Sequence, residues 1–346
     1  MQLLIVILNY NGFSLTADCL ASLEPELQAL PDVRVGLCDN GSKPEESERL
    51  GQLIDERGWN KFTTYTRLTP NRGFCGGNNA IIRPALAGSD PPEFVLLLNN
   101  DTIVRPGAIR AQLDFMKSRP DIGITGTRLE DPDGTPQVSA FRFANAFSEF
   151  DRGLRVGFVT RLLSRYVMWQ PISDTPVPTD WVAGASIMIR REVLESVGLL
   201  DEDYFTYFDD IDYCFVARKQ GWPTWYVPQS RIVHLVGKTT KVTDRSIGNP
   251  RTPGYYYVAR RRFLTKNLHP LHAAACDLAF AAGYVLHRLK CLITGRAHEF
   301  PSHILRDHIR QSVFLKGFRP PTVPNPAIVA GQELTATVHV PASVRS

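Results

Sequence analysis

The chain has 346 residues, of which 43% are hydrophobic and 21% charged, so a large buried core is expected and neither a disordered nor a fibrous protein fits. The six cysteines are scattered without a CxxC pair, which argues against a zinc ribbon or disulfide scaffold and fits reduced cytosolic thiols. The net charge of +4 is unevenly distributed, because residues 241–346 carry fifteen Lys/Arg against five Asp/Glu and residues 1–240 carry twenty-four against thirty.

The first 130 residues alternate apolar runs with helical patterns. Strands are predicted at Leu3–Leu8, Val33–Cys38, Phe62–Arg67, Phe94–Leu98 and Ile122–Gly126. Helices are predicted near Ser14–Leu23, Pro44–Arg57, Gly77–Ala87 and Pro106–Ser118. This alternation predicts an α/β fold with a mostly parallel sheet, whose ligands bind beyond the carboxyl ends of the strands. The first apolar run is too short for a signal peptide and is interpreted as a buried strand.

The alternation of predicted strands and helices stops after residue 130. Residues 131–180 are predicted to form loops with one short helix. Regular elements return as a strand at Trp181–Arg190, helices at Arg191–Val197 and Asp209–Gln220, and a strand at Thr224–Val227. The last third holds an aromatic and basic stretch (Tyr255 to Lys266), an amphipathic helix at Leu278–Ile293 and a Pro-rich end after Arg319.

An apolar strand ends abruptly in Asn99, Asn100 and Asp101. A carboxylate at a strand end, with amide oxygens beside it, is a hard oxygen site suited to Mg²⁺ or Mn²⁺ that bridges phosphates. The alternative is a simple turn, since Asn and Asp commonly end strands.

Three carboxylates, Asp209, Asp210 and Asp212, lie within four residues at the start of a predicted helix and follow four aromatic residues. Helix capping explains one or two of them, with Asp209 as the expected N-cap. It does not explain the aromatic residues. An ionised aspartate at a helix N-terminus is expected to stay deprotonated at neutral pH, as a general base must.

Two further patterns involve His234, which closes an apolar strand, and the Gly-rich segment Asn71–Asn79, which opens a helix. A neutral imidazole would suit Mn²⁺ beside carboxylate oxygens, although a lone histidine is more often structural. The glycines allow close approach of a phosphate to a helix N-terminus. The segment matches neither GxGxxG nor the P-loop, which weakens dinucleotide binding and ATP hydrolysis as functions.

Taken in order, seven segments between residues 3 and 240 resemble the family 2 glycosyltransferases, in particular the rhamnosyltransferase-like branch. The segments are Ile7–Gly12, Cys38–Ser42, Asn71–Phe74, Leu98–Asp101, Trp181–Ala185, Phe208–Asp212 and His234. The resemblance implies a GT-A fold over residues 1–240, with a nucleotide-binding half (1–130) and an acceptor-binding half (131–240). Residues 241–346 are then a basic helical extension with a Pro-rich tail.

The resemblance also implies roles for individual residues. Asp210 matches the catalytic base, with Asp209 beside it, and Asp39 would accept the N3–H of a uracil or thymine ring. Asp101 and His234 would bind Mg²⁺ or Mn²⁺. The other donor-binding residues implied are Leu8, Asn9, Asn11, Asn71, Arg72, Gly73, Phe74, Asn79, Asn99 and Asn100. Trp181, Gly184 and Ala185 would contact the acceptor.

One position departs from the family pattern, because Asn99 replaces the first carboxylate of the Asp-x-Asp metal motif. The expected activity is inverting transfer of a sugar from a nucleotide-diphosphate donor to a hydroxyl of a cell-surface glycan or lipid-linked saccharide. Rhamnose is the first expectation, ahead of galactofuranose and N-acetylhexosamines. One alternative is a nucleotidyltransferase, but that class would need a basic loop near the first strand, and this sequence has none there. The other alternative is a nucleotide-sugar-binding module without catalysis.

The basic extension suggests a partner of opposite charge. Arg260–Arg262 with Tyr255–Tyr257, followed by the Leu278–Ile293 helix, would suit an anionic membrane surface. The expected location is therefore the cytoplasm, at the inner face of the plasma membrane. The alternative is that this helix packs on the main domain or on a second subunit of an oligomer. Nucleic acid is not an expected partner, because only the basic tail favours it.

Overall fold

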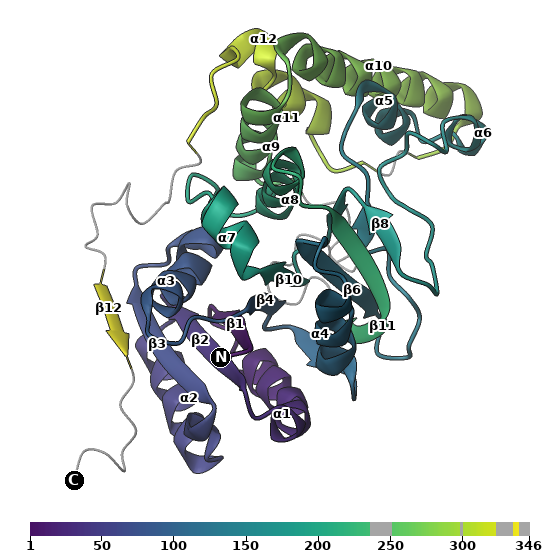
Figure 1. Ribbon diagram of the computed structural model, residues 1–346. Coiled ribbons are helices and arrows are strands. Elements are labelled where there is room, and N and C mark those ends of the chain that lie inside the picture. The colour runs from purple at the N-terminus through teal and green to yellow at the C-terminus, as the bar shows by residue number, and fades with distance from the viewer. Residues whose placement is uncertain (236–250, 298–299, 323–334, 339–346) are drawn as a thin grey trace.

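The computed structural model describes residues 1–235, 251–297, 300–322 and 335–338. A ten-stranded mixed sheet runs through its centre in the order β12-β3-β2-β1-β4-β10-β6-β11-β5, with β8 paired to β11 (Figure 1). Its strands are β1 (Leu3–Asn9), β2 (Val33–Asn40), β3 (Thr63–Thr69), β4 (Phe94–Asn99), β5 (Thr102–Val104), β6 (Ile124–Glu130), β8 (Val177–Thr179), β10 (Ser186–Arg190), β11 (Thr224–His234) and β12 (Thr335–Val338). A separate two-stranded sheet pairs β7 (Ala140–Phe141) with β9 (Trp181–Val182).

The strands β3, β2, β1 and β4 are mutually parallel, as predicted for the first half of the chain. Helices connect them along the chain: α1 (Phe13–Ala29), α2 (Pro44–Glu56), the short η1 (Trp59–Lys61) and α3 (Gly73–Ala87). The next helix, α4 (Ala108–Ser118), connects β5 to β6. Because parallel strands end at the same edge, the polar residues that follow β1, β2 and β4 are brought together.

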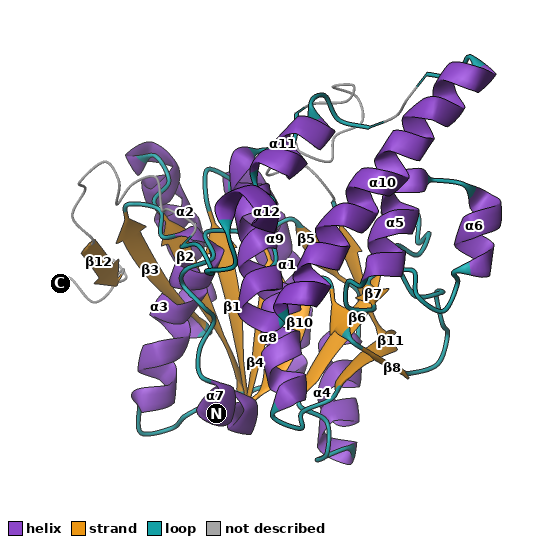
Figure 2. Ribbon diagram, turned by 90° about the horizontal axis from the view of Figure 1, so that it is seen from above, coloured by secondary structure: helices purple, strands orange, loops and turns teal. Residues whose placement is uncertain are grey.

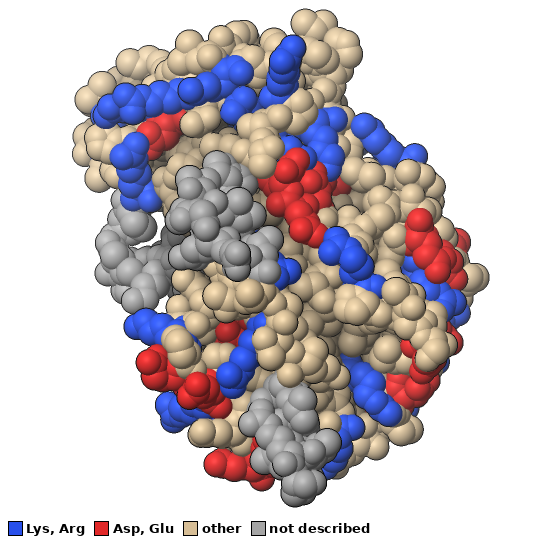
Figure 3. Space-filling model, turned by 90° about the vertical axis from the view of Figure 1, so that its left-hand side faces the viewer, with Lys and Arg blue, Asp and Glu red and all other residues tan. Residues whose placement is uncertain are grey.

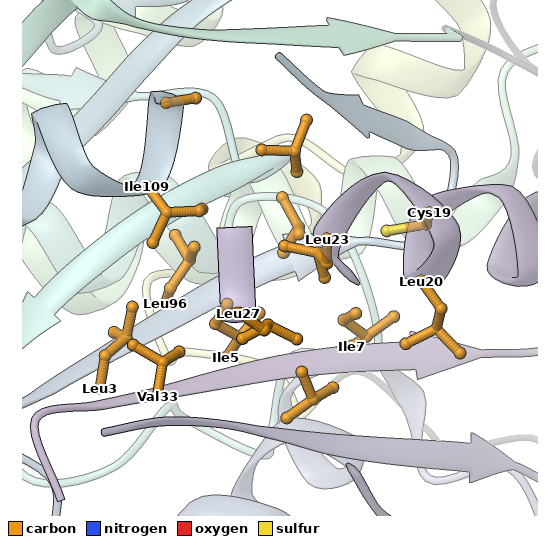
Figure 4. Close-up of a cluster of buried hydrophobic side chains, with 14 of the residues drawn as sticks. Leu3, Ile5, Ile7, Cys19, Leu20, Leu23, Leu27, Val33, Leu96 and Ile109 are labelled. Atoms are coloured by element: carbon orange, nitrogen blue, oxygen red, sulfur yellow. The ribbon is translucent and has the colours of Figure 1, made fainter. Parts of the chain in front are cut away.

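Buried side chains of β1 alternate between the two faces of the sheet. Leu3, Ile5 and Ile7 pack against the apolar side of α1, as the close-up of this cluster shows (Figure 4). Leu4 and Val6 face the opposite cluster, which includes residues of α3, α7 (Arg191–Val197) and α8 (Asp209–Lys219). Each fully buried Leu or Ile contributes about 1.5–3 kcal/mol, so these two layers fix the strand ends on which the site is built.

The second half differs from the prediction in several elements. Residues 131–180, expected as loops with one short helix, hold two helices and the strands β7 and β8. The expected strand Trp181–Arg190 is broken into β9 and β10 by Ala183, Gly184 and Ala185, and β10 runs antiparallel to both β4 and β6. The expected strand Thr224–Val227 continues to His234, with a shift in its register against β6 after Val227. The sheet is therefore mixed, with a parallel first half.

Beyond the sheet lie α5 (Ala146–Leu154), α6 (Gly157–Leu162), α9 (Gly254–Asn267), α10 (Pro270–Thr294), α11 (Ile304–Arg310) and α12 (Val313–Lys316). Seen from above, α10, α11, α12 and α6 spread as an outer layer over the molecule (Figure 2). The predicted helix Leu278–Ile293 is part of α10, which packs on α5 so closely that a Cβ on Gly283 would lie 2.3 Å from the carbonyl oxygen of Phe150.

The predicted Pro-rich tail falls mainly outside the described residues. Of the residues beyond 322, only β12 is described, and it pairs antiparallel with β3. The six cysteines are buried free thiols, consistent with the interpretation that none belongs to a disulfide.

Candidate active site

A cavity of about 1050 Å³ opens at the carboxyl ends of β1, β2 and β4. Leu8, Asn40 and Asn99 from these strand ends line one part of it, together with the loop that precedes α3. The opposite part is lined by residues of α5, α8 and α9. The chain therefore builds one cavity from segments that lie more than 150 residues apart in sequence.

Asp101 and His234 meet inside this cavity because β5 pairs with β11. His234 lies opposite Thr102 in that ladder, and the N–H of Leu235 donates to the carbonyl oxygen of Asp101 at 2.9 Å. The His234 Nε2 atom lies 3.4 Å from Asp101 Oδ1. The family pattern implies that Asp101 and His234 share a metal site. The sequence does not predict β5, the short strand whose pairing with β11 brings the two side chains together.

Asn9 and Asp39 meet at the carboxyl ends of β1 and β2, beneath the part of the cavity that Leu8 and Asn40 line. They lie opposite each other in the β1–β2 ladder, and Asn9 Nδ2 donates to Asp39 Oδ2 at 2.8 Å. The N–H of Ser42 donates to the other oxygen, Asp39 Oδ1, at 3.0 Å. Asp39 is only 1% exposed, so Asn9 and Ser42 cover it and it does not itself line the cavity.

The loop before α3 is held by side-chain amides. Asn40 Nδ2 donates to the Asn71 Oδ1 atom at 3.2 Å and to the Gly73 carbonyl at 2.9 Å, and Asn40 Oδ1 accepts from the Arg72 N–H. Gly73 has a φ of +73°, and a Cβ there would lie 2.4 Å from the Phe205 carbonyl oxygen. Gly73 is therefore required both by its conformation and by its contact with the loop that leads to α8.

The aspartates at the start of α8 occupy different environments. Burial raises the pKa of Asp210 to about 6, while hydrogen bonds from the Ile211 and Gly184 N–H groups oppose the rise. Burial and the neighbouring charge of Asp210 raise the pKa of Asp209 to about 8. Burial therefore disfavours the ionised form of both carboxyl groups, and the two N–H donors favour ionisation of Asp210.

This result corrects two expectations for Asp209. It is the first residue of α8, and the N-cap is Phe208, which makes no side-chain capping bond. Burial also raises the pKa of its carboxyl group, against the expectation that the helix N-terminus keeps it readily ionised. Tyr207 and Phe208 both have positive φ, at +66° and +64°, a costly conformation for aromatic residues that turns the chain sharply into α8.

The segment between β9 and β10 supplies a third wall. The Gly184 N–H donates to Asp210 Oδ2 at 3.0 Å, and the Ala185 carbonyl accepts from the Asn99 N–H at 3.0 Å. Trp181 stacks on Phe141 with 4.2 Å between ring centroids and donates its Nε1–H to the Arg142 carbonyl. Trp181, Gly184 and Ala185 all line the cavity, so this break in the strand joins the Asn99 and Asp210 regions.

Most of the predicted site residues line the cavity. These are Leu8, Asn9, Asn71, Gly73, Phe74, Asn99, Asn100, Asp101, Trp181, Gly184, Ala185, Asp209, Asp210 and His234. Asn11, Asp39, Arg72 and Asn79 do not line it. Asn11 Oδ1 accepts from the Lys43 N–H, and Arg72 Nη2 donates to the Thr335 carbonyl in β12.

Asn79 has a structural explanation instead of the predicted contact. It is buried, its Nδ2 donates to the Leu200 carbonyl at 2.8 Å, and its Oδ1 accepts from the Leu200 N–H at 3.2 Å. Both ends of the amide therefore fix α3 to the segment after α7, and we do not retain Asn79 as a donor contact.

The sequence-based interpretation missed the wall formed by α5 and α9. Glu149 and Arg152 of α5 and Tyr255, Tyr256 and Arg260 of α9 line the cavity. Arg260 donates to Glu149 Oε2 at 2.8 Å and to Asp277 Oδ1 at 2.5 Å, with Arg260 nearly fully buried. Burial would raise the pKa of Glu149, but Arg152 and Arg260 outweigh it and lower that pKa to about 2. No local motif marks Glu149 or Arg152 for this position.

The same contacts change the predicted membrane patch. Arg260 is buried in the interior, and Arg262 is paired with Asp201 at 2.8 Å and with Asp203 at 2.6 Å. Tyr257 is also buried, while Tyr255 and Tyr256 pack around Tyr207. Arg260, Arg262 and Tyr257 therefore belong to the protein interior, and Tyr255 and Tyr256 line the cavity. The stretch is not the continuous membrane-facing patch that the sequence suggested.

The ligand chemistry of the cavity fits a divalent cation that is shared with a substrate. Among the residues described, no group of three or more His, Cys, Asp or Glu side chains could hold a metal ion alone. The neighbouring Asp101 carboxylate and His234 imidazole supply two ligands of the types that Mn²⁺ and Mg²⁺ accept. The remaining positions would have to come from a ligand that carries oxygen atoms, such as a diphosphate.

The fold and this cavity define the class of protein. The chain is similar to a mannosyltransferase, PcManGT, from Pyrobaculum calidifontis, solved with GDP-Man and Mn²⁺, with a TM-score of 0.53 and 16% identity over 92% of this chain and 82% of that one. It is also similar to GalNAc-T7, solved with UDP, GalNAc and Mn²⁺, with a TM-score of 0.50 and 17% identity over 76% of this chain but only 51% of that one. These likenesses show a GT-A fold.

The sequence then gives the family. Residues 2–248 match the model of the glycosyltransferase-like family 2, and the chain belongs to this family. An N-acetylglucosaminyl-diphospho-decaprenol L-rhamnosyltransferase of Mycobacterium tuberculosis (strain CDC 1551 / Oshkosh) is 29% identical over 218 residues, which cover 60% of this chain and 68% of the relative. This similarity supports the rhamnosyltransferase-like branch. The family match ends before α9, so the wall with Tyr255 and Arg260 lies outside it.

Proposed function

We propose that the protein transfers a sugar from a nucleotide-diphosphate donor to an acceptor hydroxyl with inversion at the anomeric carbon, and that Asp210 is the general base. One observation carries the proposal: Asp210 lines the same cavity as the neighbouring pair Asp101 and His234. A base on one wall and a site for the leaving diphosphate on another are what a single displacement requires.

In this mechanism, Asp210 accepts the proton of the acceptor hydroxyl while its oxygen attacks the anomeric carbon. The carbon–oxygen bond to the diphosphate breaks, and its electron pair leaves with the diphosphate. The Gly184 and Ile211 N–H groups keep the Asp210 carboxylate oriented and ionised. Asp101 and His234 would hold Mg²⁺ or Mn²⁺, which when bound supplies positive charge to the leaving group.

The donor end of the cavity is proposed to be the one that Leu8, Asn9 and Asn40 line. Asp39 lies behind Asn9 and accepts a hydrogen bond from its side-chain amide. The Asp39 carboxylate would accept a pyrimidine N3–H only after the Asn9 side chain moved aside. The loop residues Gly73 and Phe74 would then lie beside the ribose. Asn99 and Asn100 follow at the diphosphate end.

The donor we propose is deoxythymidine-diphosphate rhamnose, because the M. tuberculosis relative carries the name of a rhamnosyltransferase. The acceptor we propose is a lipid-linked saccharide at the cytoplasmic face of the membrane, by the same likeness. The alternative is a galactofuranosyl or N-acetylhexosaminyl transferase of the same fold, and the test must distinguish it from a rhamnosyltransferase.

A thermal-shift screen of nucleotide-sugars with and without Mn²⁺ tests the donor. A ligand present at about 100 times its Kd stabilises the fold by about 2.7 kcal/mol, so the true donor should raise Tm clearly. The expected result is a larger shift with deoxythymidine-diphosphate rhamnose than with UDP-linked sugars. A rise in Tm with a UDP-sugar alone would replace deoxythymidine-diphosphate rhamnose as the proposed donor. An unchanged Tm with every nucleotide-sugar would contradict the proposed function.

A further inference from the structure

An exposed apolar and basic surface covers the outer side of α10 and α12. Its large apolar side chains are Leu278, Val285, Leu286, Leu289, Leu292 and Ile293 on α10 and Phe314, Leu315 and Phe318 on and after α12. Leu292 is 73% exposed and Ile293 is 85% exposed. The inner side of the same helix is buried against α5, so α10 has two apolar sides and only one of them is covered.

The charges on this surface have one sign. Within residues 270–297 and 300–322, Arg288, Arg296, Arg306, Arg310, Lys316 and Arg319 are exposed. The acidic residues of those ranges, Asp277 and Asp307, are buried and paired with Arg260 and Arg251. Figure 3 shows Lys and Arg predominating over the upper part of the molecule, whereas both signs mix below it.

A groove of about 850 Å³ lies within this surface, between α10 and the segment at α11. Val285, Leu289, Leu292 and Leu305 supply apolar lining, and Arg288 and Arg306 line it as well. Apolar side chains next to guanidinium groups match a molecule that joins a hydrocarbon chain to an anionic head group.

We propose that this surface, defined by the exposed residues of α10, α11 and α12, binds the surface of a bilayer that contains anionic lipid. The helix would lie in the plane of the interface with its apolar residues among the acyl chains and its arginines among the head groups. None of the described helices is long and apolar enough to cross a membrane.

Charge decides between the possible occupants. A second copy of the chain would place this basic surface against another basic surface, and like charges oppose that contact. A nucleic acid would satisfy the arginines but would leave Leu292, Ile293 and Phe314 exposed to water. An anionic bilayer satisfies both the charges and the apolar side chains.

The basic and apolar surface lies close to the cavity. α5 lies between α10 and the cavity, because it presents Glu149 and Arg152 to the cavity while Gly153 contacts the backbone of α10 at Phe280 and Gly283. Docking of α10 on a bilayer would therefore place the acceptor side of the cavity within one helix layer of the lipid. This consequence for a lipid-linked acceptor rests on the proposed function, but the lipid binding itself does not.

Flotation of the full chain with vesicles tests the proposal, with phosphatidylcholine alone compared with phosphatidylcholine and phosphatidylglycerol at low ionic strength. We expect co-flotation with the anionic vesicles and release as salt is raised. Leu292→Asp should reduce the bound fraction at least tenfold, whereas Val138→Asp, at an exposed apolar residue outside this surface, should not. Arg288→Gln with Arg306→Gln should weaken binding about tenfold or more, and Arg110→Gln with Lys117→Gln on α4 should leave it unchanged.

The outcomes separate this proposal from the proposed function. Wild-type protein that stays at the bottom of the gradient with anionic vesicles, while still binding its nucleotide-sugar, would overturn the lipid proposal alone. Concentration-dependent dimerisation that Leu292→Asp abolishes would assign the surface to a second copy and also overturn it. Unchanged Tm and nucleotide-sugar affinity in the Leu292→Asp variant would show that its loss of lipid binding is not a loss of folding.

Discussion

The backbone N–H of Gly184 donates a hydrogen bond to Oδ2 of Asp210 at 3.0 Å, and a Cβ on Gly184 would lie 3.3 Å from the same oxygen. Replacement of Gly184 by Ala should therefore move the carboxylate by a few tenths of an ångström. We expect kcat to fall about tenfold with the Kd of the nucleotide-sugar unchanged, because misplacement of a reacting group costs rate without removing donor contacts. A loss of donor affinity equal to the loss of kcat would contradict this role of Gly184.

Asp210→Asn should reduce kcat by about 10²–10⁴ and leave donor binding intact, since it removes a positioned base and keeps its shape. Because burial raises the pKa of Asp210 to about 6, the wild-type rate should fall as pH falls through that value and the base is protonated. Steady-state rates from pH 5 to 8 would measure this limb. Near-normal turnover of Asp210→Asn would remove Asp210 from the mechanism.

Asp209 allows a separate test through stability. Burial raises its pKa in the folded protein to about 8, above the ordinary value of 3.8, so the folded state binds the proton more tightly than the unfolded state. Its contribution to stability is therefore present at low pH and is lost as pH rises toward 8. Asp209→Asn should raise Tm relative to wild type more at pH 8 than at pH 4. An equal change in Tm at both values would show that Asp209 titrates normally.

Asp101 and His234 should govern the effect of metal on the donor. We expect Mn²⁺ to tighten binding of a nucleotide diphosphate in the wild type and to have little effect in Asp101→Ala, because the carboxylate is the anionic ligand of the pair. His234→Ala should show an intermediate effect, and His272→Ala, an exposed histidine of α10, should behave as wild type. Isothermal titration with and without Mn²⁺ measures this. An unaltered Mn²⁺ effect in Asp101→Ala would place the metal elsewhere.

Arg260 should be a major determinant of stability. Its removal takes a buried cationic partner from Asp277 and from Glu149, which keeps only Arg152, and loss of a buried ion-pair partner typically costs about 3–5 kcal/mol. Arg260→Ala should lower Tm by roughly 4–7 °C, whereas Arg261→Ala, at the adjacent half-buried residue, should lower it much less. Similar losses for the two variants would mean that the ion pairs of Arg260 contribute little.

Much of the site was predictable because it consists of short patterns at strand ends. Asn9, Asp101 and His234 each follow or close a recognisable apolar run, and Asp210 lies in the acidic start of a predicted helix. The prediction was less successful where neighbours decide the environment. The N-cap of α8 is Phe208 and not Asp209, and Asn79 bonds the Leu200 backbone, because sequence shows neither burial nor the partner of a side chain.

The sequence by itself determined the parallel first half of the sheet, its covering helices and the family, since these depend on local periodicity and on motifs in order. Only the tertiary structure decided that β5 pairs with β11 and so places His234 beside Asp101, and that α9 turns back to close the cavity. It also decided that Arg260 is buried and that α10 keeps an exposed apolar side. These features depend on contacts between residues far apart in the chain, and charge or hydropathy at one position does not reveal which neighbour will cover it.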